Sequence, residues 1–257
     1  MFYATLVLEG QPPSSSSGFP WLLVPVVAIA VVAFFAFRWW HREQAFGRFA
    51  ATHAMTFIGT DLGNVEQKQL GVVPLDELPL TFLTYHRAPS FEDFLIGQWK
   101  GVPERAAHFR YAVGPREHSH TVHFTVVVAQ YPMGVPEICI VRRGALVGLL
   151  EFLGGTGLKF ESDEFNRRFH VTCSDEAFAY KFLDPRLMQW LLLNEEAFPV
   201  ILTLAESYAL FGTKWIKNPE RLVPHLDAAV ALRDQIPRLV WSEYGRTLPP
   251  ITGTVAS

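Results

Sequence analysis

Near the start of the chain, a long apolar stretch is interrupted by no charged side chain. From Gly10 to Phe37 there is no Asp, Glu, Lys, Arg or His, and residues 19–37 read FPWLLVPVVAIAVVAFFAF. At about 1.5 Å per helical residue, such a segment spans roughly the 30 Å hydrocarbon core of a bilayer. Trp39 and Trp40 follow it, where interfacial aromatic residues occur. The pattern predicts a transmembrane helix over residues 19–40.

A cleavable signal peptide is the main alternative for this stretch. Ala28-Ile29-Ala30 resembles a cleavage site, but it lies inside the apolar run. The only charged side chain before the run is Glu9, whereas a signal peptide has a basic start. A buried core helix is also disfavoured, because such helices are seldom apolar on every face.

The charges that flank the apolar stretch predict its orientation. Arg38, Arg42 and Arg48 follow it, with Glu43 as the nearby acid, and nothing basic precedes it except the amino terminus. Positive side chains favour the cytoplasmic side of a membrane. We therefore expect a single-pass protein of the inner (plasma) membrane, with residues 1–18 as a short extracytoplasmic tail and the C-terminal part in the cytoplasm.

The rest of the chain mixes helical and strand periodicities. Residues 41–55 have helical character, with Phe46 and Phe49 on one face, and predict a juxtamembrane helix. Residues 56–245 predict a single cytoplasmic α+β domain, in which several helices pack on an antiparallel sheet. Residues 246–257 are expected to be a disordered tail.

The strongest strand pattern is a hairpin at His108–Val128. Apolar residues occupy every second position on both arms, on either side of a Gly-Pro turn. Pairing Phe109 with Phe124 and Tyr111 with Val122 brings both apolar sets to one face. That agreement predicts the register of the hairpin.

Further elements follow from periodicity and from helix-capping residues. The predicted elements are a strand at Ile138–Val141, a helix at Gly144–Leu153, an extended strand pair in Lys159–Thr172, a helix starting near Ser174 or Asp175, a second helix starting at Asp184-Pro185, closing strands at Val200–Leu204 and Tyr208–Phe211, and a last helix starting at Asn218-Pro219 or Pro224. The Gly144–Leu153 helix is expected to pack on the sheet. A second interpretation lays it on the membrane surface, although it lacks the usual basic face.

Composition narrows the class of protein. Apolar residues make up 49% of the chain and charged residues 18%, unlike a disordered chain. A formal net charge of −3 argues against a general nucleic-acid binder, which normally has a basic excess. Cys139 and Cys173 stand far apart in no metal or redox spacing, which fits a reducing compartment, although the two could pair with each other.

Four histidines near the hairpin are the first candidate for chemistry: His108, His118, His120 and His123. On a strand, His118 and His120 share a face, and that spacing can bind a metal. Glu117 would point the other way, and no Cys or Asp completes the set. We therefore interpret these residues as loop and surface histidines, with His123 on the outer face opposite Arg110.

Other candidate residues lack the context that their chemistry needs. Gly154-Gly155-Thr156-Gly157 has neither the Lys-Ser/Thr ending of a P-loop nor a dinucleotide fingerprint. Cys173 stands before a predicted helix whose dipole can lower a thiol pKa, but a small buried residue is the favoured interpretation. Neither Ser174, which can serve as a helix cap, nor Ser207 lies in a nucleophile elbow.

Pairs of like charge complete the candidates. The acidic pairs Asp163-Glu164, Asp175-Glu176 and Glu195-Glu196 are expected to be solvated. The basic pairs Arg142-Arg143 and Arg167-Arg168 can meet anionic lipid headgroups, although lipid-binding clusters usually hold four to eight basic residues together. We predict no catalytic, cofactor-binding or metal-ligating residue.

One stretch resembles a known family. The signature is Phe-Asn-x-Arg-Phe, then Asp, then Leu-x-Pro. It is carried by Glu161, Ser162, Phe165, Asn166, Arg168, Phe169, Val171, Asp175, Ala179, Leu183, Pro185 and Leu191, with Trp99-Lys100-Gly101, Phe109, Tyr111 and Ile236-Pro237 to Trp241 around it. These residues, within roughly 99–245, are similar to an uncharacterised family of bacterial membrane-anchored proteins with a domain of unknown function. The resemblance implies a cytoplasmic domain near an N-terminal membrane helix and implies no reaction.

The physical interpretation of the signature is structural. Phe165 and Phe169 are expected to pack, Asn166 to form a turn or cap, and Arg168 to pair with an acid.

These observations favour a membrane-tethered module that binds a partner protein or organises an assembly at the inner membrane face. Its expected partners are the lipid bilayer, through residues 19–40, and a protein, with no nucleic acid and no cofactor. A hydrolase-like enzyme with a site near the histidines is one alternative. Lipid binding by Gly144–Leu153 is another.

Overall fold

The computed structural model describes residues 23–59, 73–84, 86–114, 118–144, 157–194 and 200–247. The chain forms two compact units, residues 1–41 and 42–257. Helix α1, Leu23–Thr52, begins in the first unit and ends in the second. Among the described residues, α1 is the one helix that is both long enough and apolar enough to cross a membrane.

The part of α1 in the first unit is an apolar surface. Its large side chains from Val24 to Trp40 are exposed, and no residue of its most apolar window is buried. A core helix of a soluble protein would bury such side chains, because exposing them to water is unfavourable. Apolar side chains exposed on all sides are typical of a helix that is surrounded by lipid.

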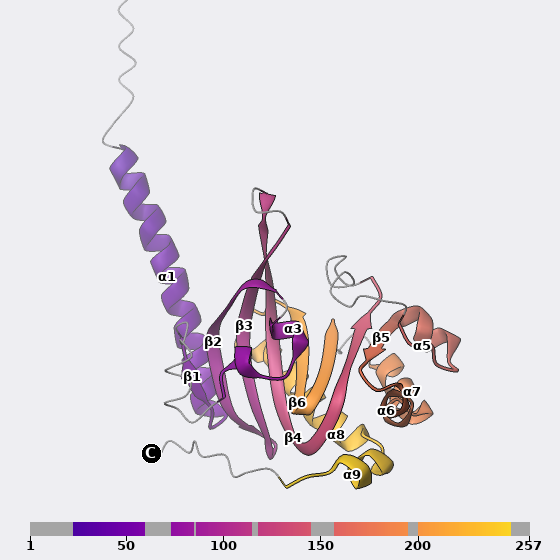
Figure 1. Ribbon diagram of the computed structural model, residues 1–257. Helices are drawn as coiled ribbons and strands as arrows, with labels where there is room; N and C mark the ends of the chain where they lie inside the picture. Colours follow the sequence, from indigo (N-terminus) through magenta and orange to yellow (C-terminus); the bar gives the residue numbers. More distant parts are fainter. Residues whose placement is uncertain are drawn as a thin grey trace, which may run out of the picture. The chain divides into compact units, whose positions relative to one another are not determined.

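The second unit is built on an antiparallel sheet (Figure 1). Its strands are β1 (Thr56–Ile58), β2 (Arg87–Trp99), β3 (Val102–Val113), β4 (His120–Arg142), β5 (Phe169–Cys173) and β6 (Ile201–Lys214). The order is β1-β2-β3-β4-β5, and β6 also pairs with β4. The α+β class expected from the sequence is therefore confirmed.

The predicted hairpin register is confirmed residue by residue. Phe109 pairs with Phe124, and Tyr111 pairs with Val122, as β3 runs antiparallel to β4. The first half of β4 lies between β3 and β6, and its second half lies between β5 and β6. The two halves are separated by shifts in the β4–β6 register between Gln130 and Ile138.

Both faces of the sheet are covered. On one face, Phe109 and Phe124 pack with Leu75–Glu77, a 3-10 helix, and with α3 (Thr81–Thr84). On the other face lie the last turns of α1 and the helices α5 (Asp163–Arg168), α6 (Glu176–Phe182), α7 (Pro185–Leu193), α8 (Val223–Gln235) and α9 (Arg238–Tyr244), with a 3-10 turn at Pro219–Leu222. Figure 1 shows α5, α6 and α7 gathered beside β5.

Several of these helices begin at a residue whose side chain caps the first turn. The Asp175 carboxylate accepts a hydrogen bond from the Phe178 N–H, and the Asp184 carboxylate accepts one from Leu187. Each bond satisfies a backbone donor that the first helical turn leaves without a partner. Asp175, one of the two predicted caps, is therefore the cap of α6. Ser174 instead donates its hydroxyl to the carbonyl of Glu137.

Three sequence-based predictions need comment. The strand pair in Lys159–Thr172 is wrong at residues 163–168, which form α5, because Ser162 caps a helix there. The two closing strands are one strand, β6, in which Glu206 adopts a positive φ of 52°. The Gly144–Leu153 helix lies, apart from Gly144, outside the described residues.

The signature residues have the expected structural roles. Phe165 and Phe169 are buried, with ring centroids 4.9 Å apart. The Asn166 amide closes a turn, accepting from the Phe160 N–H and donating to the Phe160 carbonyl at 2.9 and 2.6 Å. Arg168 pairs with Glu164 at 3.2 Å.

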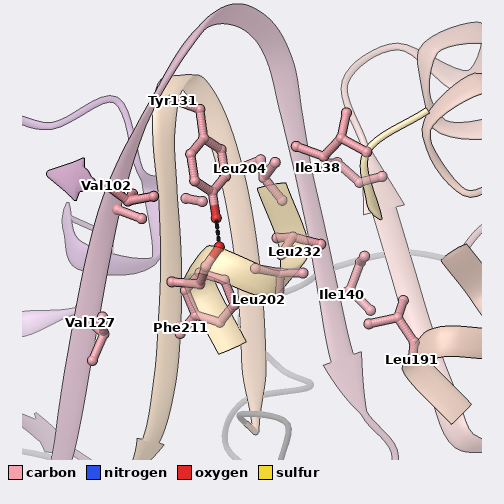
Figure 2. Packing of buried hydrophobic residues seen from close by; sticks show 14 of the residues in the cluster. Val102, Val127, Tyr131, Ile138, Ile140, Leu191, Leu202, Leu204, Phe211 and Leu232 are labelled. Atoms are coloured by element: carbon pink, nitrogen blue, oxygen red, sulfur yellow. Dashed lines mark hydrogen bonds between the residues drawn. The ribbon is translucent and has the colours of Figure 1, made fainter. Parts of the chain in front are cut away.

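A buried tyrosine connects β4 to α8. The hydroxyl of Tyr131 donates to the carbonyl of Ala229 at 2.6 Å, between Leu202, Leu204 and Leu232 (Figure 2). A buried hydroxyl needs such a partner, because water is not available to it.

Glu104 lies on the same face of the sheet and is only 1% exposed. Among the described residues, neither of its carboxyl oxygens has a hydrogen-bond partner. Burial, with a smaller contribution from the negative charge of Asp227, raises the pKa of Glu104 to about 9. Glu104 is therefore a neutral acid in the folded protein at pH 7.

Replacing Glu104 by Gln tests this protonation state. The folded pKa lies above the ordinary value of 4.5, so the free energy of unfolding falls as pH rises between the two values. Glu104→Gln removes that loss. We expect the variant to match the wild type near pH 5 and to be more stable by about 3 kcal/mol at pH 7. Urea unfolding of the full-length protein in detergent micelles measures this, and parallel pH profiles would contradict it.

Candidate functional site

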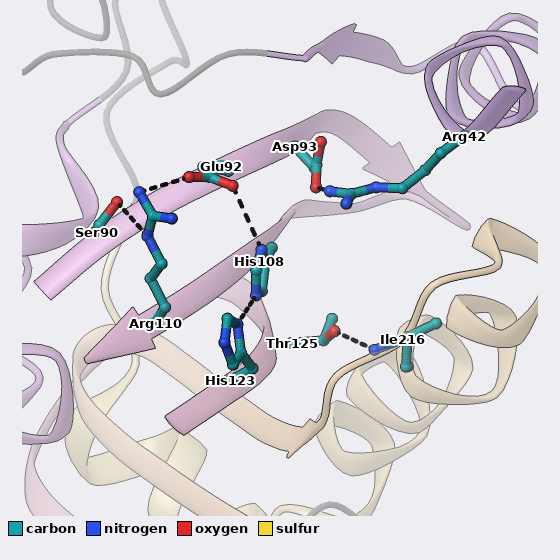
Figure 3. Close-up of polar contacts among 9 residues, drawn as sticks. All are labelled: Arg42, Ser90, Glu92, Asp93, His108, Arg110, His123, Thr125 and Ile216. Carbon is teal, nitrogen blue, oxygen red and sulfur yellow. Dashed lines mark hydrogen bonds and ion pairs between the residues drawn. The ribbon is translucent and has the colours of Figure 1, made fainter. Parts of the chain in front are cut away.

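Charged and aromatic side chains gather where β2, β3 and β4 meet the segment after β6 (Figure 3). We call Glu92, His108, Arg110, His123 and Trp215 the histidine cluster. Beside it, Arg42 of α1 reaches Asp93 of β2. All of these residues belong to the unit formed by residues 42–257.

A β-bulge in β2 brings two adjacent acids to one face. The pairing shifts between Glu92, opposite His108, and Leu95, opposite Ala106, so β2 has one extra residue in this interval. Asp93 takes a positive φ of 55° there. Asp tolerates this backbone region better than most residues. Glu92 therefore approaches His108, and Asp93 and His108 line one small pocket.

Asp93 is the buried partner of an ion pair with Arg42. Its exposed fraction is 9%, and the Arg42 guanidinium contacts its carboxylate directly. A buried carboxylate is stable in its charged form only beside a positive charge or hydrogen-bond donors. Arg42 also lies over the ring of Trp215, 5.7 Å from its centroid. The ion pair joins the end of α1 in this unit to the sheet.

Within the cluster, Glu92 pairs with Arg110. The carboxylate and guanidinium are 2.7 Å apart, and Arg110 Nε donates to Ser90 Oγ at 3.2 Å. His108 Nδ1 is 3.7 Å from Glu92 Oε2, which is too long for a hydrogen bond. His108 Nε2 and His123 Nδ1 are hydrogen-bonded at 3.0 Å.

His108 is neutral at physiological pH. Burial, followed by the charges of His123, Arg42 and Arg110, lowers the pKa of His108 to about 4. Its 3.7 Å approach to Glu92 is therefore not an ion pair at pH 7. A general base works best with a pKa near the operating pH, so this ring is poorly suited to abstract a proton.

Aromatic stacking holds both imidazoles. The Trp215 ring stacks on His108 and His123, with centroids 4.7 and 5.2 Å away. Lys217 Nζ lies 4.6 Å from the same ring. Nearby, the Ile216 N–H donates to Thr125 Oγ1 at 2.8 Å, which fixes the segment after β6 against β4 (Figure 3).

The pocket beside the cluster is small. It is lined by Phe46, Asp93, His108, Thr125 and Ile216, among others, and holds about one water molecule. Ligand pockets are typically hundreds of Å³. The geometry of this region therefore suits a structural junction better than a binding cavity.

The structure joins only two of the four predicted histidines. His108 was expected at the surface and is instead 6% exposed, because both faces of the sheet are covered. His123 is exposed and pairs with Arg110, as predicted. His120 lies three positions from His123 along β4, on the opposite face and about 10 Å away. In the described part of the chain no three His, Cys, Asp or Glu residues form a metal-binding group, and Glu117 lies outside it.

The cysteines are free thiols without activation. Burial raises the pKa of Cys139 to about 12, although Thr203 donates a hydrogen bond to its sulfur. Burial also raises the pKa of Cys173, so the expected lowering by the helix dipole does not prevail. Cys139 is buried, whereas Cys173 is only half-buried, unlike the small buried residue that was expected there.

The remaining candidates separate clearly. Asp163-Glu164 and Asp175-Glu176 stand at the starts of α5 and α6. Negative charges there interact favourably with the helix dipole. Gly154-Gly155-Thr156 and Glu195-Glu196 lie outside the described residues, and Ser207 is a half-buried residue of β6. Sequence analysis missed Asp93, Glu104 and Trp215, since none lies in a motif.

The fold and the site define an α+β protein with an apolar N-terminal helix and a polar junction. This junction consists of Arg42, Glu92, Asp93 and Arg110, whose charges are paired with one another. No family model and no curated protein matches the sequence. The fold is similar to the crystal structure of the mycobacterial trehalose monomycolate transport factor A, TtfA, with a TM-score of 0.50. The two share 11% identity over 81% of this chain and 98% of that chain. At this identity the likeness shows the fold alone.

The Arg42–Asp93 pair gives the second prediction. Arg42→Ala leaves a buried carboxylate without its countercharge and is expected to lower the free energy of unfolding by about 2–3 kcal/mol. In an Asp93→Asn background the same change should cost much less, because a neutral amide needs no countercharge. Urea unfolding of the full-length protein in micelles measures both.

Arg48→Ala is the matched control, since Arg48 is an exposed arginine on the same helix. It should change stability by less than about 0.5 kcal/mol. Equal losses for Arg42→Ala in both backgrounds would show that the ion pair is not the source of the effect.

Proposed function

We propose that this chain is a single-pass inner-membrane protein whose C-terminal unit lies in the cytoplasm and serves as a non-catalytic interaction or scaffold module. The observation that carries the proposal is the exposed apolar surface of α1 from Val24 to Trp40. Arg38, Arg42 and Arg48 at its end favour the cytoplasmic side. The resemblance to membrane-anchored bacterial proteins of unknown function agrees with this proposal.

The chemistry of the histidine cluster supports an interaction module rather than an enzyme. Glu92 is neutralised by Arg110, Asp93 by Arg42, and the His108 ring is a weak base. The charged groups of this region thus make their strongest interactions with one another, within the protein. Such a network holds the shape of the unit, so that its outer surface can recognise a partner.

A second candidate function is a supporting role in lipid transport at the membrane. It rests on the fold likeness to TtfA, which covers 98% of that chain. Lipid extraction from the protein purified in micelles, followed by mass spectrometry, tests it. A stoichiometric glycolipid or phospholipid would favour this candidate, and a lipid profile equal to that of an unrelated single-pass protein would count against it.

The orientation is the third prediction. A green fluorescent protein fused after residue 257 should fluoresce in cells, and alkaline phosphatase at the same position should be inactive. As a matched control, Arg38→Gln and Arg48→Gln combined with Glu9→Lys remove basic charge from one flank and add it to the other. Because orientation follows this bias, the control should raise phosphatase activity. An active phosphatase on the unaltered chain would refute the cytoplasmic placement.

The interaction role is tested by photo-crosslinking in native membranes. Large apolar side chains are exposed at Tyr180 on α6, Leu193 on α7 and Leu239 on α9, and such residues are frequent at interfaces. A photoreactive residue at these positions should give a discrete adduct, whereas Arg221, an exposed polar control, should not. Identical products from all four positions would indicate random collision and contradict a specific partner surface.

A further inference from the structure

The chain at the end of β6 carries two exposed lysines on either side of a tryptophan. Lys214 and Lys217 are exposed, and Trp215 between them is half-buried. Within the described chain, lysine ion pairs are formed by other residues, so neither of these two lysines has an acid beside it. The described range 200–247 contains this stretch without a gap. We call Lys214–Lys217 the tryptophan segment.

The ring of Trp215 is fixed, but its N–H group is not used by the fold. The ring stacks on two imidazoles and lies 5.7 Å from the Arg42 guanidinium. In the described part of the chain its indole N–H has no hydrogen-bond partner, whereas the N–H of Trp99 donates to Asp227. A half-buried indole with a free donor is typical of membrane–water interfaces, where the ring is sheltered and the N–H is solvated.

The acids near the tryptophan segment are already balanced. The carboxylate of the histidine cluster is paired with Arg110, and that of Asp93 with Arg42. The next acid along the chain, Glu220, is followed directly by Arg221. The two lysines of the segment therefore add positive charge that these acids do not neutralise.

A short tether connects this segment to the predicted membrane span. Arg42, which lies over the Trp215 ring, is separated from Trp40 by a single residue. Trp40 is the last aromatic residue of the predicted transmembrane helix. A short connection gives lipid headgroups a high effective concentration around the residues that Arg42 contacts.

We propose that the tryptophan segment binds the headgroups of anionic phospholipids in the membrane that holds α1, an inference that rests on the proposed function. The ammonium groups of Lys214 and Lys217 bind phosphate oxygens, and the Trp215 N–H donates a hydrogen bond to a lipid oxygen. Lysine suits this contact, because its apolar stem can lie along the ring while its charge reaches the headgroups. Each lysine near an anionic surface strengthens binding by about fivefold.

The test uses the full-length protein, labelled with fluorotryptophan, in lipid nanodiscs. Discs contain phosphatidylcholine alone, phosphatidylcholine with phosphatidylglycerol, or phosphatidylcholine with inorganic phosphate in the buffer, and all contain a trace of lipid with gadolinium on its headgroup. The fluorine signal of Trp215, assigned with Trp215→Phe, should broaden most with phosphatidylglycerol. High salt should remove the difference, since it screens exposed charges. Its dependence on the phosphatidylglycerol fraction gives the docking constant.

Variants locate the effect. Lys214→Gln should weaken docking by about fivefold, and Lys214→Gln combined with Lys217→Gln by about 25-fold. Lys159→Gln, which removes an exposed lysine outside the segment, is the matched control and should leave docking unchanged. If the double variant fails to fold because Lys217 packs on Trp215, the single variant decides.

Three outcomes would overturn the proposal. Equal broadening of the Trp215 signal with and without phosphatidylglycerol excludes binding of anionic headgroups. A shift of that signal with inorganic phosphate, without extra broadening by the anionic lipid, identifies a soluble anion as the ligand instead. Docking that is unchanged in the well-folded lysine variants places the lipid contact elsewhere. The purified system does not depend on cellular orientation, so a failure here is distinguishable from a failure of the orientation experiment.

Discussion

The pairing of β4 on both of its edges is the constraint on which the second unit depends. This strand pairs with β3 and then β5, and with β6 along both halves. Its residues alternate between two buried faces, so Phe124 and Val127 enter different cores. Where the β4–β6 register shifts between Gln130 and Ile138, the alternation also shifts, and Ile138 and Ile140 return to the face of Val127.

Covering both faces has a consequence for polar residues. On a one-sided sheet, His108 and Glu104 would face water, whereas here both are almost fully buried. Each is stable there in its neutral form, with the pKa of the base lowered and that of the acid raised. Asp93 instead stays beside a positive charge, Arg42. The polar groups of the interior thus follow one rule: they are neutral or paired.

The sequence predicted local features better than long-range ones. The hairpin register and the caps of α6 and α7 depend on residues close together in the chain, so period-two alternation and Asp175 or Asp184 were sufficient. The burial of His108 could not be predicted, because it requires knowing that a second layer covers its face. Trp215 reaches the histidines only through the β4–β6 pairing. The helix at α5 was missed because its Phe165–Phe169 spacing fits a strand's same-face pattern as well as a helical turn.

The charged groups that join β2, β3 and the end of α1 are balanced within the fold, and this balance decides what they can do. At the junction, Arg42 faces Asp93 and Arg110 faces Glu92, so each cation has an acid beside it. Breaking those pairs to bind a ligand would leave a charge buried or half-buried, which is costly. These pairs are therefore expected to keep the unit rigid rather than to bind a ligand.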